Sequence, residues 1–159
     1  MTARGALDLT VQTSLSSEEK ALAPPRRMIR AWARAALLEG PAEVAIRLVG
    51  EAEGHELNLT YRGKDYATNV LTFAYGVADL LPDATAPGPL SGDMVLCVPV
   101  IQREAAEQGK ALDAHFAHMI VHGMLHLQGY DHEEAHAADV MEGMETDILA
   151  RLGYGNPYA

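Results

Sequence analysis

The sequence predicts an α+β fold in which a sheet of about four strands packs against helices. Segments with alternating apolar residues lie on either side of a helical segment near the start of the chain, two short β-rich segments follow, and the last third has the apolar spacing of helices. A length of 159 residues with 48% hydrophobic residues suits one globular domain over residues 1–159 and leaves too little chain for two.

The first elements are predicted to be a strand, a helix and a second strand. Residues 6–12 and 43–49 alternate apolar and polar side chains, as half-buried strands do. The helix between them is expected to have Pro25 in its first turn and to end at Gly40-Pro41. Its apolar residues share one side, and its opposite side carries the four residues that we call the arginine row: Arg26, Arg27, Arg30 and Arg34.

The rest of the chain is predicted to be mainly helical, with two further strands. The expected helices cover residues 51–61, 101–108, 111–128 and 134–152. The expected strands cover residues 69–73 and 94–98, and the stretch 78–92 between them is rich in proline and glycine and is predicted as a loop. This order of elements does not determine the order of the strands in the sheet.

The charge of the chain is acidic but unevenly distributed. There are 12 basic and 22 acidic residues, a formal net charge of −10, which argues against a protein that coats nucleic acid through a large basic surface. Residues 1–64 carry nine basic and eight acidic residues, whereas residues 65–159 carry three and fourteen. A polyanionic partner is therefore expected to meet the first part of the chain.

Cysteine content and hydropathy exclude several classes of protein. Cys97 is the only cysteine, so an intrachain disulfide and a cysteine-based metal site are impossible, and nitrogen and oxygen must hold any metal. No apolar run approaches the roughly 20 residues of a membrane-spanning helix, and residues 1–14 lack the apolar block of a secretion signal. The expected location is the cytoplasm, with no membrane partner.

Histidines provide the strongest chemical signal. Four of the seven lie on one face of the predicted helix 111–128: His115, His118, His122 and His126. A lone histidine on a half-buried face is usually structural, and packing or solvent exposure is the favoured role for His115 and His118, although either could extend a site. His122 and His126 lie one turn apart, so that their imidazoles can reach a single small cation.

A third metal ligand must come from outside that helix. Gly129 supplies the backbone freedom for the chain to leave the helix and double back, and His132 then faces the same cation. Three neutral imidazoles leave a fourth position open for water, which is typical of a catalytic zinc site. The sequence therefore predicts one Zn²⁺ at the end of a long helix, held by His122, His126 and His132.

The spacing of these ligands equals that of the metzincin pattern H-E-x-x-H-x-x-G-x-x-H, with one difference. Gly123 stands where a metallopeptidase has its general-base glutamate, which makes a peptidase the lesser hypothesis. A zinc peptidase stays an alternative if Asp131 or Glu145 replaces that glutamate. Asp131 is otherwise expected either to orient a ligand histidine or to cap the turn.

The segment from His122 to His132, HGMLHLQGYDH, resembles the signature of the YbeY family of bacterial ribosomal RNA maturation factors. Further segments fit the family: Leu57–Arg62 with Asp65, Thr68–Phe73, Gly92–Cys97 and Met141–Tyr158. The resemblance covers most of residues 43–158. One departure is the segment Thr72-Phe73-Ala74-Tyr75, where members of the family often carry Ser-Phe-Pro.

The resemblance implies a fold, an activity and a set of residues. It implies an α+β fold with a short mixed sheet and a metal in a cleft between helices, and the family's zinc ligands fall on His122, His126 and His132. An active-site arginine of the family falls on Arg62. The implied activity is a metal-dependent endoribonuclease that trims the 3′ end of small-subunit ribosomal RNA and acts in ribosome quality control, with ribosomal proteins or an assembly GTPase as partners.

The resulting hypothesis is a zinc hydrolase of single-stranded RNA, with His122 and Arg62 as the predicted catalytic residues. Zinc would lower the pKa of a bound water, and Arg62 would stabilise charge that develops on the phosphate. The arginine row is the candidate surface for the RNA backbone, with a solvated face as the alternative. The rival functions are the zinc peptidase and a non-catalytic ribosome assembly factor with a structural metal.

Overall fold

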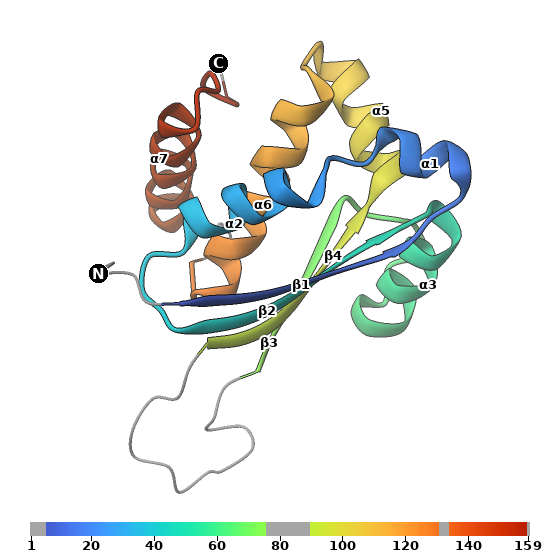
Figure 1. Cartoon of the computed structure of the whole chain (residues 1–159), viewed down its shortest axis with the longest axis horizontal. Helices are drawn as coiled ribbons and strands as arrows, with labels where there is room; N and C mark the ends of the chain where they lie inside the picture. Colours follow the sequence, from blue (N-terminus) through green and yellow to red (C-terminus); the bar gives the residue numbers. More distant parts are fainter. Residues whose placement is uncertain (1–5, 76–89, 131–133, 159) are drawn as a thin grey trace, which may run out of the picture.

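The centre of the structure is a four-stranded sheet with the strand order β1-β2-β4-β3 (Figure 1). A computed structural model describes residues 6–75, 90–130 and 134–158 of the chain. The strands are β1 (Leu7–Ser14), β2 (Ala42–Val49), β3 (Val70–Tyr75) and β4 (Leu90–Cys97). β1, β2 and β4 are parallel, whereas β3 pairs antiparallel with β4 at one edge. The predicted α+β class and mixed four-stranded sheet are confirmed.

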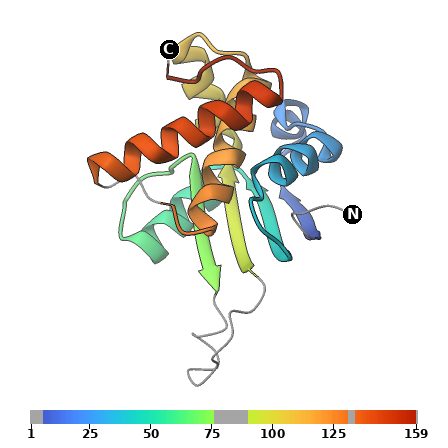
Figure 2. The ribbon, with the colours of Figure 1, turned by 90° about the vertical axis from the view of Figure 1, so that its left-hand side faces the viewer.

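Most helices lie over one face of this sheet (Figures 1 and 2). They are α1 (Ser17–Leu22), α2 (Arg26–Ala36), α3 (Glu51–Arg62), α5 (Val98–Gln108), α6 (Leu112–Leu127) and α7 (Ala135–Arg151). α2 and α6 pack against each other on the sheet, and α7 packs on α6. Each predicted helix is present with boundaries shifted by a few residues. Residues 78–89 of the predicted loop 78–92 lie outside the described residues, whereas residues 90–92 are not loop but the beginning of β4, which starts four residues earlier than predicted.

The connection between β1 and β2 differs from the prediction, because it contains two helices and not one. Ser16 begins the short helix α1 with a capping box, in which the Glu19 amide donates to Ser16 Oγ at 3.2 Å and the Ser16 amide donates to Glu19 Oε1 at 2.8 Å. Prolines 24 and 25 then separate α1 from α2, since proline lacks the amide hydrogen that would continue a helix. Pro25 is the N-cap of α2 and lies just before its first turn.

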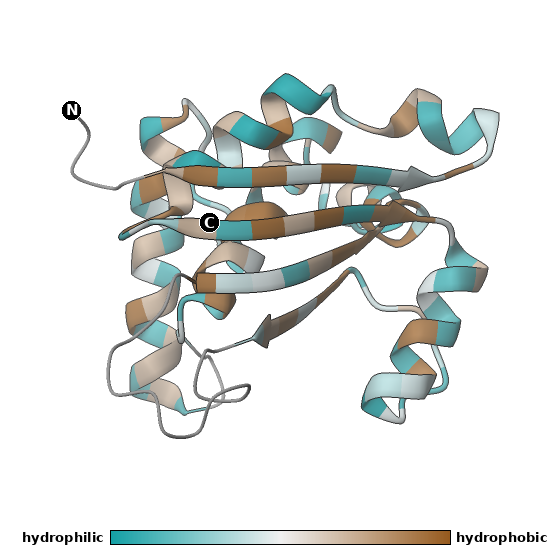
Figure 3. Cartoon of the chain, turned by 60° about the horizontal axis from the view of Figure 1, so that its bottom comes forward, coloured by the Kyte–Doolittle hydropathy of each residue, from teal (hydrophilic) through white to brown (hydrophobic). Residues whose placement is uncertain are grey.

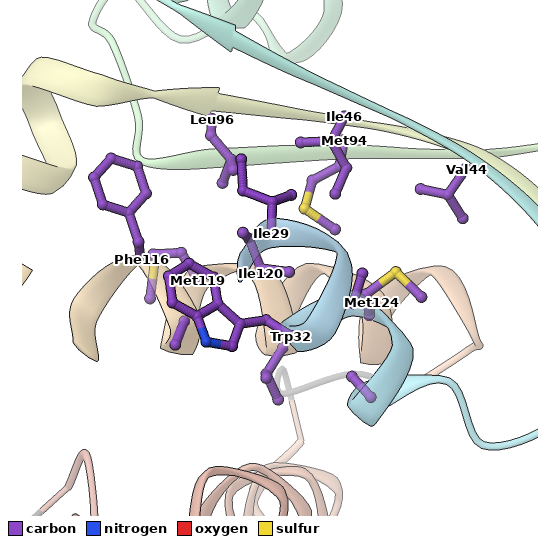
Figure 4. Close-up of a cluster of buried hydrophobic side chains, with 14 of the residues drawn as sticks. Ile29, Trp32, Val44, Ile46, Met94, Leu96, Phe116, Met119, Ile120 and Met124 are labelled. Carbon is purple, nitrogen blue, oxygen red and sulfur yellow. The ribbon is translucent and has the colours of Figure 1, made fainter. Parts of the chain in front are cut away.

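The main core lies between the sheet and the pair α2 and α6 (Figure 4). Ile29 and Trp32 of α2 belong to one buried cluster with side chains of β2, β4 and α6: Val44, Ile46, Met94, Leu96, Phe116, Met119, Ile120 and Met124. Burying each large side chain contributes roughly 1.5–3 kcal/mol. α6 is buried on most of its surface, so its histidine face is held in a fixed place relative to β3 and β4.

The opposite face of the sheet is covered at one end by α3 (Figure 3). A second, smaller apolar cluster lies there and joins α3 to the strands: Val49, Leu71, Val95, Cys97 and Val100, with Leu57 and Phe73 at its margin. This packing sets the end of α3 beside the edge strand β3. No helix within the described residues is long and apolar enough to cross a lipid bilayer.

Candidate active site

A cleft of about 800 Å³ lies between the edge of the sheet and the histidine face of α6. One wall is formed by Thr68–Thr72, which lead into and begin β3, together with Arg62 at the end of α3. The other wall is formed by His118, His122 and His126 of α6, with Tyr130 and Tyr158 beside them. The cleft therefore brings Arg62, which was predicted from the family resemblance, together with the histidine pair His122 and His126, which was predicted from its spacing.

The two described candidate ligands occupy adjacent turns of α6. The ring centroids of His122 and His126 lie 4.9 Å apart, with an angle of 70° between the ring planes, and both side chains are half-buried. Imidazole nitrogens in such a pair are suitable donors for one Zn²⁺ ion. The donor set therefore fits a zinc ion on the side of α6 that faces the cleft.

The chain leaves α6 in the way that the sequence predicts. Gly129 has a φ of +99°, and the amide of Tyr130 donates to the carbonyl of Leu125 at 3.1 Å, which closes the last turn. The next residues, Asp131 and His132, lie outside the described residues. Within the parts of the chain that are described, no three His, Cys, Asp or Glu side chains form a metal-binding group. The set of three ligands stays a prediction.

The key contact behind the cleft is made by a buried carboxylate. Glu145 of α7 is 0% exposed, and its Oε2 accepts a hydrogen bond of 2.5 Å from Nδ1 of His122. Its Oε1 accepts from Nε2 of His118 at 3.2 Å and from the hydroxyl of Tyr158. Burial raises the pKa of Glu145, but the hydrogen bonds from these three residues outweigh burial and lower the pKa to about 2.

This contact sets the tautomer of His122. An ionised carboxylate can only accept hydrogen bonds, so Nδ1 of His122 carries the proton and the lone pair of the ring lies on Nε2. A histidine that ligates a metal usually has its second nitrogen held in this manner. From the sequence, Glu145 was part of the late segment that fits the family, and the only role predicted for it was that of a substitute base in a peptidase. The available signal was a glutamate within the apolar stripe of the last helix, near Met141 and Ile148.

His115 and His118 are both buried, as packing predicts, but their roles differ. His118 extends the site, because it shares Glu145 with His122. His115 lies one turn earlier, and its Nε2 is 2.9 Å from Oε1 of Glu104. Burial lowers the pKa of His115, and its contact with Glu104 only partly offsets this. Glu104 also accepts from Nδ2 of Asn69, a residue that lines the cleft.

Arg62 reaches the cleft from the last residue of α3. Its Nη2 donates to the backbone carbonyl of Thr72 at 2.7 Å, and its guanidinium carbon lies 5.1 Å from the centre of the Phe73 ring. Gly63, with a φ of +70°, ends the helix directly after it. These contacts with β3 hold the exposed, positively charged guanidinium of Arg62 at the cleft.

Gly123 lies on the core side of α6 and away from the cleft. A Cβ atom added at this position would lie 2.7 Å from Cε and 2.8 Å from Sδ of Met94, which is itself fully buried. A glutamate at position 123 would therefore force the end of the Met94 side chain to shift and would place a carboxylate beside it in the core. The geometry of α6 gives a physical reason for the absence of the peptidase glutamate, and the contacts of Glu145 leave that carboxylate poorly placed to replace it.

The arginine row lies on the exposed side of α2 and does not line the cleft. The apolar side of α2 is buried against α6 and the sheet, as the spacing predicts. Arg30 donates to the carbonyl of Leu9 at 3.5 Å, which places it near β1 at the edge opposite β3.

The sequence matches the family described as Endoribonuclease YbeY over residues 10–153. The chain belongs to the YbeY family of endoribonucleases. A YbeY endoribonuclease of Aromatoleum aromaticum is 60% identical over 158 residues, which cover 99% of this chain and 96% of that protein. One of Azoarcus sp. is 64% identical over 153 residues, and the match covers 96% of this chain but 60% of the Azoarcus protein.

Further comparisons agree with the YbeY assignment. A YbeY endoribonuclease of Pseudomonas putida is 53% identical over 151 residues, with 94% of each chain covered. A solution structure of a Thermotoga maritima protein has a TM-score of 0.51 and 22% identity, with 91% of each chain covered, and this likeness supports the fold alone. The predicted family and the predicted enzyme class, an endoribonuclease and hence a hydrolase, are confirmed.

Proposed function

We propose that this YbeY protein is a zinc-dependent endoribonuclease that cuts single-stranded RNA in the cleft between β3 and α6. The observation that carries the proposal is the hydrogen bond from His122 Nδ1 to the buried Glu145, because His122 lines the cleft together with His126 and Arg62. His122, His126 and His132 would hold the ion. When bound, Zn²⁺ would lower the pKa of a water molecule and polarise a phosphate oxygen.

The protein's own residues would bind and orient the substrate. Arg62, steadied by Thr72 and Phe73, presents a guanidinium whose N–H groups can donate to phosphodiester oxygens and stabilise charge that develops there. Glu145 keeps the ring of His122 in one orientation. Arg62 and Glu145 already make these contacts in the structure. The site is therefore largely formed before substrate binds.

The natural substrate that we propose is ribosomal RNA, at the 3′ end of the small-subunit RNA, with a role in ribosome quality control. The names of the relatives support an endoribonuclease, and the resemblance of the sequence extends this to ribosomal RNA maturation in the cytoplasm. Ribosomal proteins or an assembly GTPase are the partners that this role would require. The arginine row would add contacts to RNA phosphates outside the cleft.

A cleavage assay on matched RNAs tests the proposal. Wild-type protein loaded with Zn²⁺ should cut a labelled single-stranded RNA faster than the same sequence in a duplex, and chelation followed by zinc should abolish and then restore cleavage. His126→Ala should be inactive, and His136→Ala, an exposed histidine on α7, should match the wild type. Cleavage that survives complete removal of metal would refute the zinc mechanism.

A peptide library incubated with the same preparations tests the main rival. Hydrolysis of peptides that is lost in His126→Ala would support a peptidase. The positions of Gly123 and Glu145 lead us to expect no hydrolysis.

A further inference from the structure

We propose that Tyr158, in the segment that follows α7, is a positioning residue for the metal site, which holds Glu145 and through it the ring of His122. The proposal rests on the proposed function, because it assigns His122 as a metal ligand. It adds that the segment after α7 must pack against α6 and the turn before it for the site to have its full geometry.

The geometry around Glu145 divides its two oxygens between different partners. Oε2 accepts from His122, whereas Oε1 accepts from the hydroxyl of Tyr158 and from His118. The hydroxyl oxygen of Tyr158 also lies 3.2 Å from Nε2 of His118, and the two rings meet edge to face with centroids 5.3 Å apart. Tyr158 therefore contacts both the carboxylate of Glu145 and His118, the second donor to the same carboxylate oxygen.

The position of Tyr158 depends on how the last residues fold back. After α7 the chain returns toward the turn between α5 and α6 (Figure 2), where Nζ of Lys110 donates to the carbonyl of Pro157 at 2.7 Å. The amide of Tyr158 donates to Oδ1 of Asn156 at 2.8 Å. These contacts hold the segment that follows α7 against the turn between α5 and α6.

A partly exposed tyrosine that reaches a fully buried carboxylate is the feature that points to this role. Tyr158 is 47% exposed as a residue, yet its hydroxyl meets Glu145, which is 0% exposed. If the hydroxyl were absent, Oε1 would keep only the 3.2 Å contact with His118. The carboxylate could then rotate, and His122 would lose part of the constraint on its ring.

The test compares Tyr158→Phe with Tyr75→Phe. Each change removes one hydroxyl, each tyrosine is 47% exposed, and each donates to a carboxylate, because Tyr75 donates to Asp93 at 3.0 Å outside the cleft. Two quantities are measured: the dissociation constant for Zn²⁺, by competition with a chromophoric chelator, and the ¹⁵N signals of the His122 ring in metal-free protein. A thermal melt confirms that both variants fold.

We expect Tyr158→Phe to bind Zn²⁺ about tenfold more weakly than the wild type, and to shift or broaden the His122 ring signals, while Tyr75→Phe matches the wild type in both. If wild type and both variants bind zinc equally and their ring signals coincide, the inference is overturned and the proposed function stands. If the wild type binds no zinc, the proposed function fails. The ring signals then decide the inference on their own, since they need no metal.

Discussion

Nδ1 of His122 lies 2.5 Å from Oε2 of Glu145, and the carboxylate that holds this imidazole is wholly buried. The two residues are 23 positions apart and lie on different helices, α6 and α7. Their contact fixes which nitrogen of His122 faces the cleft. The packing of α7 on α6 therefore contributes directly to the chemistry of the site.

Replacing Glu145 should weaken metal binding. In Glu145→Gln the amide removes the charge and one acceptor, so the donors of His118, His122 and Tyr158 are left with too few partners. We expect Zn²⁺ affinity to fall roughly 10- to 100-fold. Competition titration measures this, with Asp147→Asn, an exposed change two residues along α7, as the control. Equal affinities in the two variants would contradict the role of Glu145.

Substituting Arg62 by lysine should lower the rate more than the affinity. Lysine keeps the charge but lacks the planar fork that contacts Thr72 and lies over Phe73. We expect the single-turnover rate of RNA cleavage to fall about 10²- to 10³-fold, with RNA affinity changed less than about threefold. Single-turnover kinetics and anisotropy binding separate the two quantities. A large loss of affinity at an unchanged rate would make Arg62 a binding residue only.

Introducing the peptidase glutamate should damage the fold and add no peptidase activity. In Gly123→Glu the new side chain meets Met94 inside the core, so the free energy of unfolding should fall by more than about 3 kcal/mol. Gly143→Glu on α7 is the matched control, because nothing lies within 4 Å of a Cβ there. Denaturant titration measures both. A stable Gly123→Glu protein that hydrolyses peptides would revive the metallopeptidase hypothesis.

The stability of the protein should fall as the pH drops below about 6.5, in part through His115. Burial lowers the pKa of His115 in the folded state, and the nearby groups that act on it are Glu104, His118 and Lys110. The unfolded chain therefore takes up a proton that the folded chain refuses, at a cost of up to about 1.4 kcal/mol per pH unit. Above that pH both states are neutral and the effect vanishes.

The variant His115→Gln isolates the contribution of His115 to the pH dependence of the free energy of unfolding. Glutamine can still donate to Glu104 but does not titrate in this range. Unfolding free energies at pH 7.5, 6.5 and 5.5 should fall less steeply in the variant than in the wild type. Parallel profiles for the two proteins would show that the titration of His115 is not coupled to folding.

Removing the arginine row should reduce the salt dependence of RNA binding. Replacing Arg26, Arg27, Arg30 and Arg34 by alanine removes four exposed cations from one side of α2. Each phosphate contact on a single strand contributes about 0.7 to the slope of log affinity against log salt, so the slope should fall by up to about 3. Fluorescence anisotropy across a salt series measures it, with Arg103→Ala, which is paired with Glu51, as the control. If the slope of log affinity against log salt is unchanged, the arginine row is a solvated face that does not contact RNA.

Much of the fold could be predicted because the patterns that indicate strands and helices lie within short stretches of sequence. Alternating residues in β1 and β2, and the apolar stripes of α2 and α6, record which side of each element faces the core. The short helix α1 was missed although Ser16 and Glu19 have capping-box spacing, since six residues give too little periodicity. The strand order depends on pairing between distant segments, which local patterns do not encode.

The candidate site was predictable only where its residues are close in sequence. His122 and His126 share one helix, so their spacing alone brings them together. Glu145 reaches His122 from α7, and Tyr158, in the segment after α7, reaches Glu145, so this proximity results from tertiary packing. Arg62 was assigned by family resemblance, and its contact with Thr72 explains why it reaches the cleft.

Zinc stoichiometry measured together with RNA cleavage tests the central claim most directly. Elemental analysis of purified wild type, His122→Ala and His136→Ala should find one equivalent of zinc in the wild type and in His136→Ala, and none in His122→Ala. Cleavage of a short single-stranded RNA should follow the same pattern and stop on chelation. Zinc that stays bound in His122→Ala, or RNA cleavage by that variant at the wild-type rate, would contradict the account.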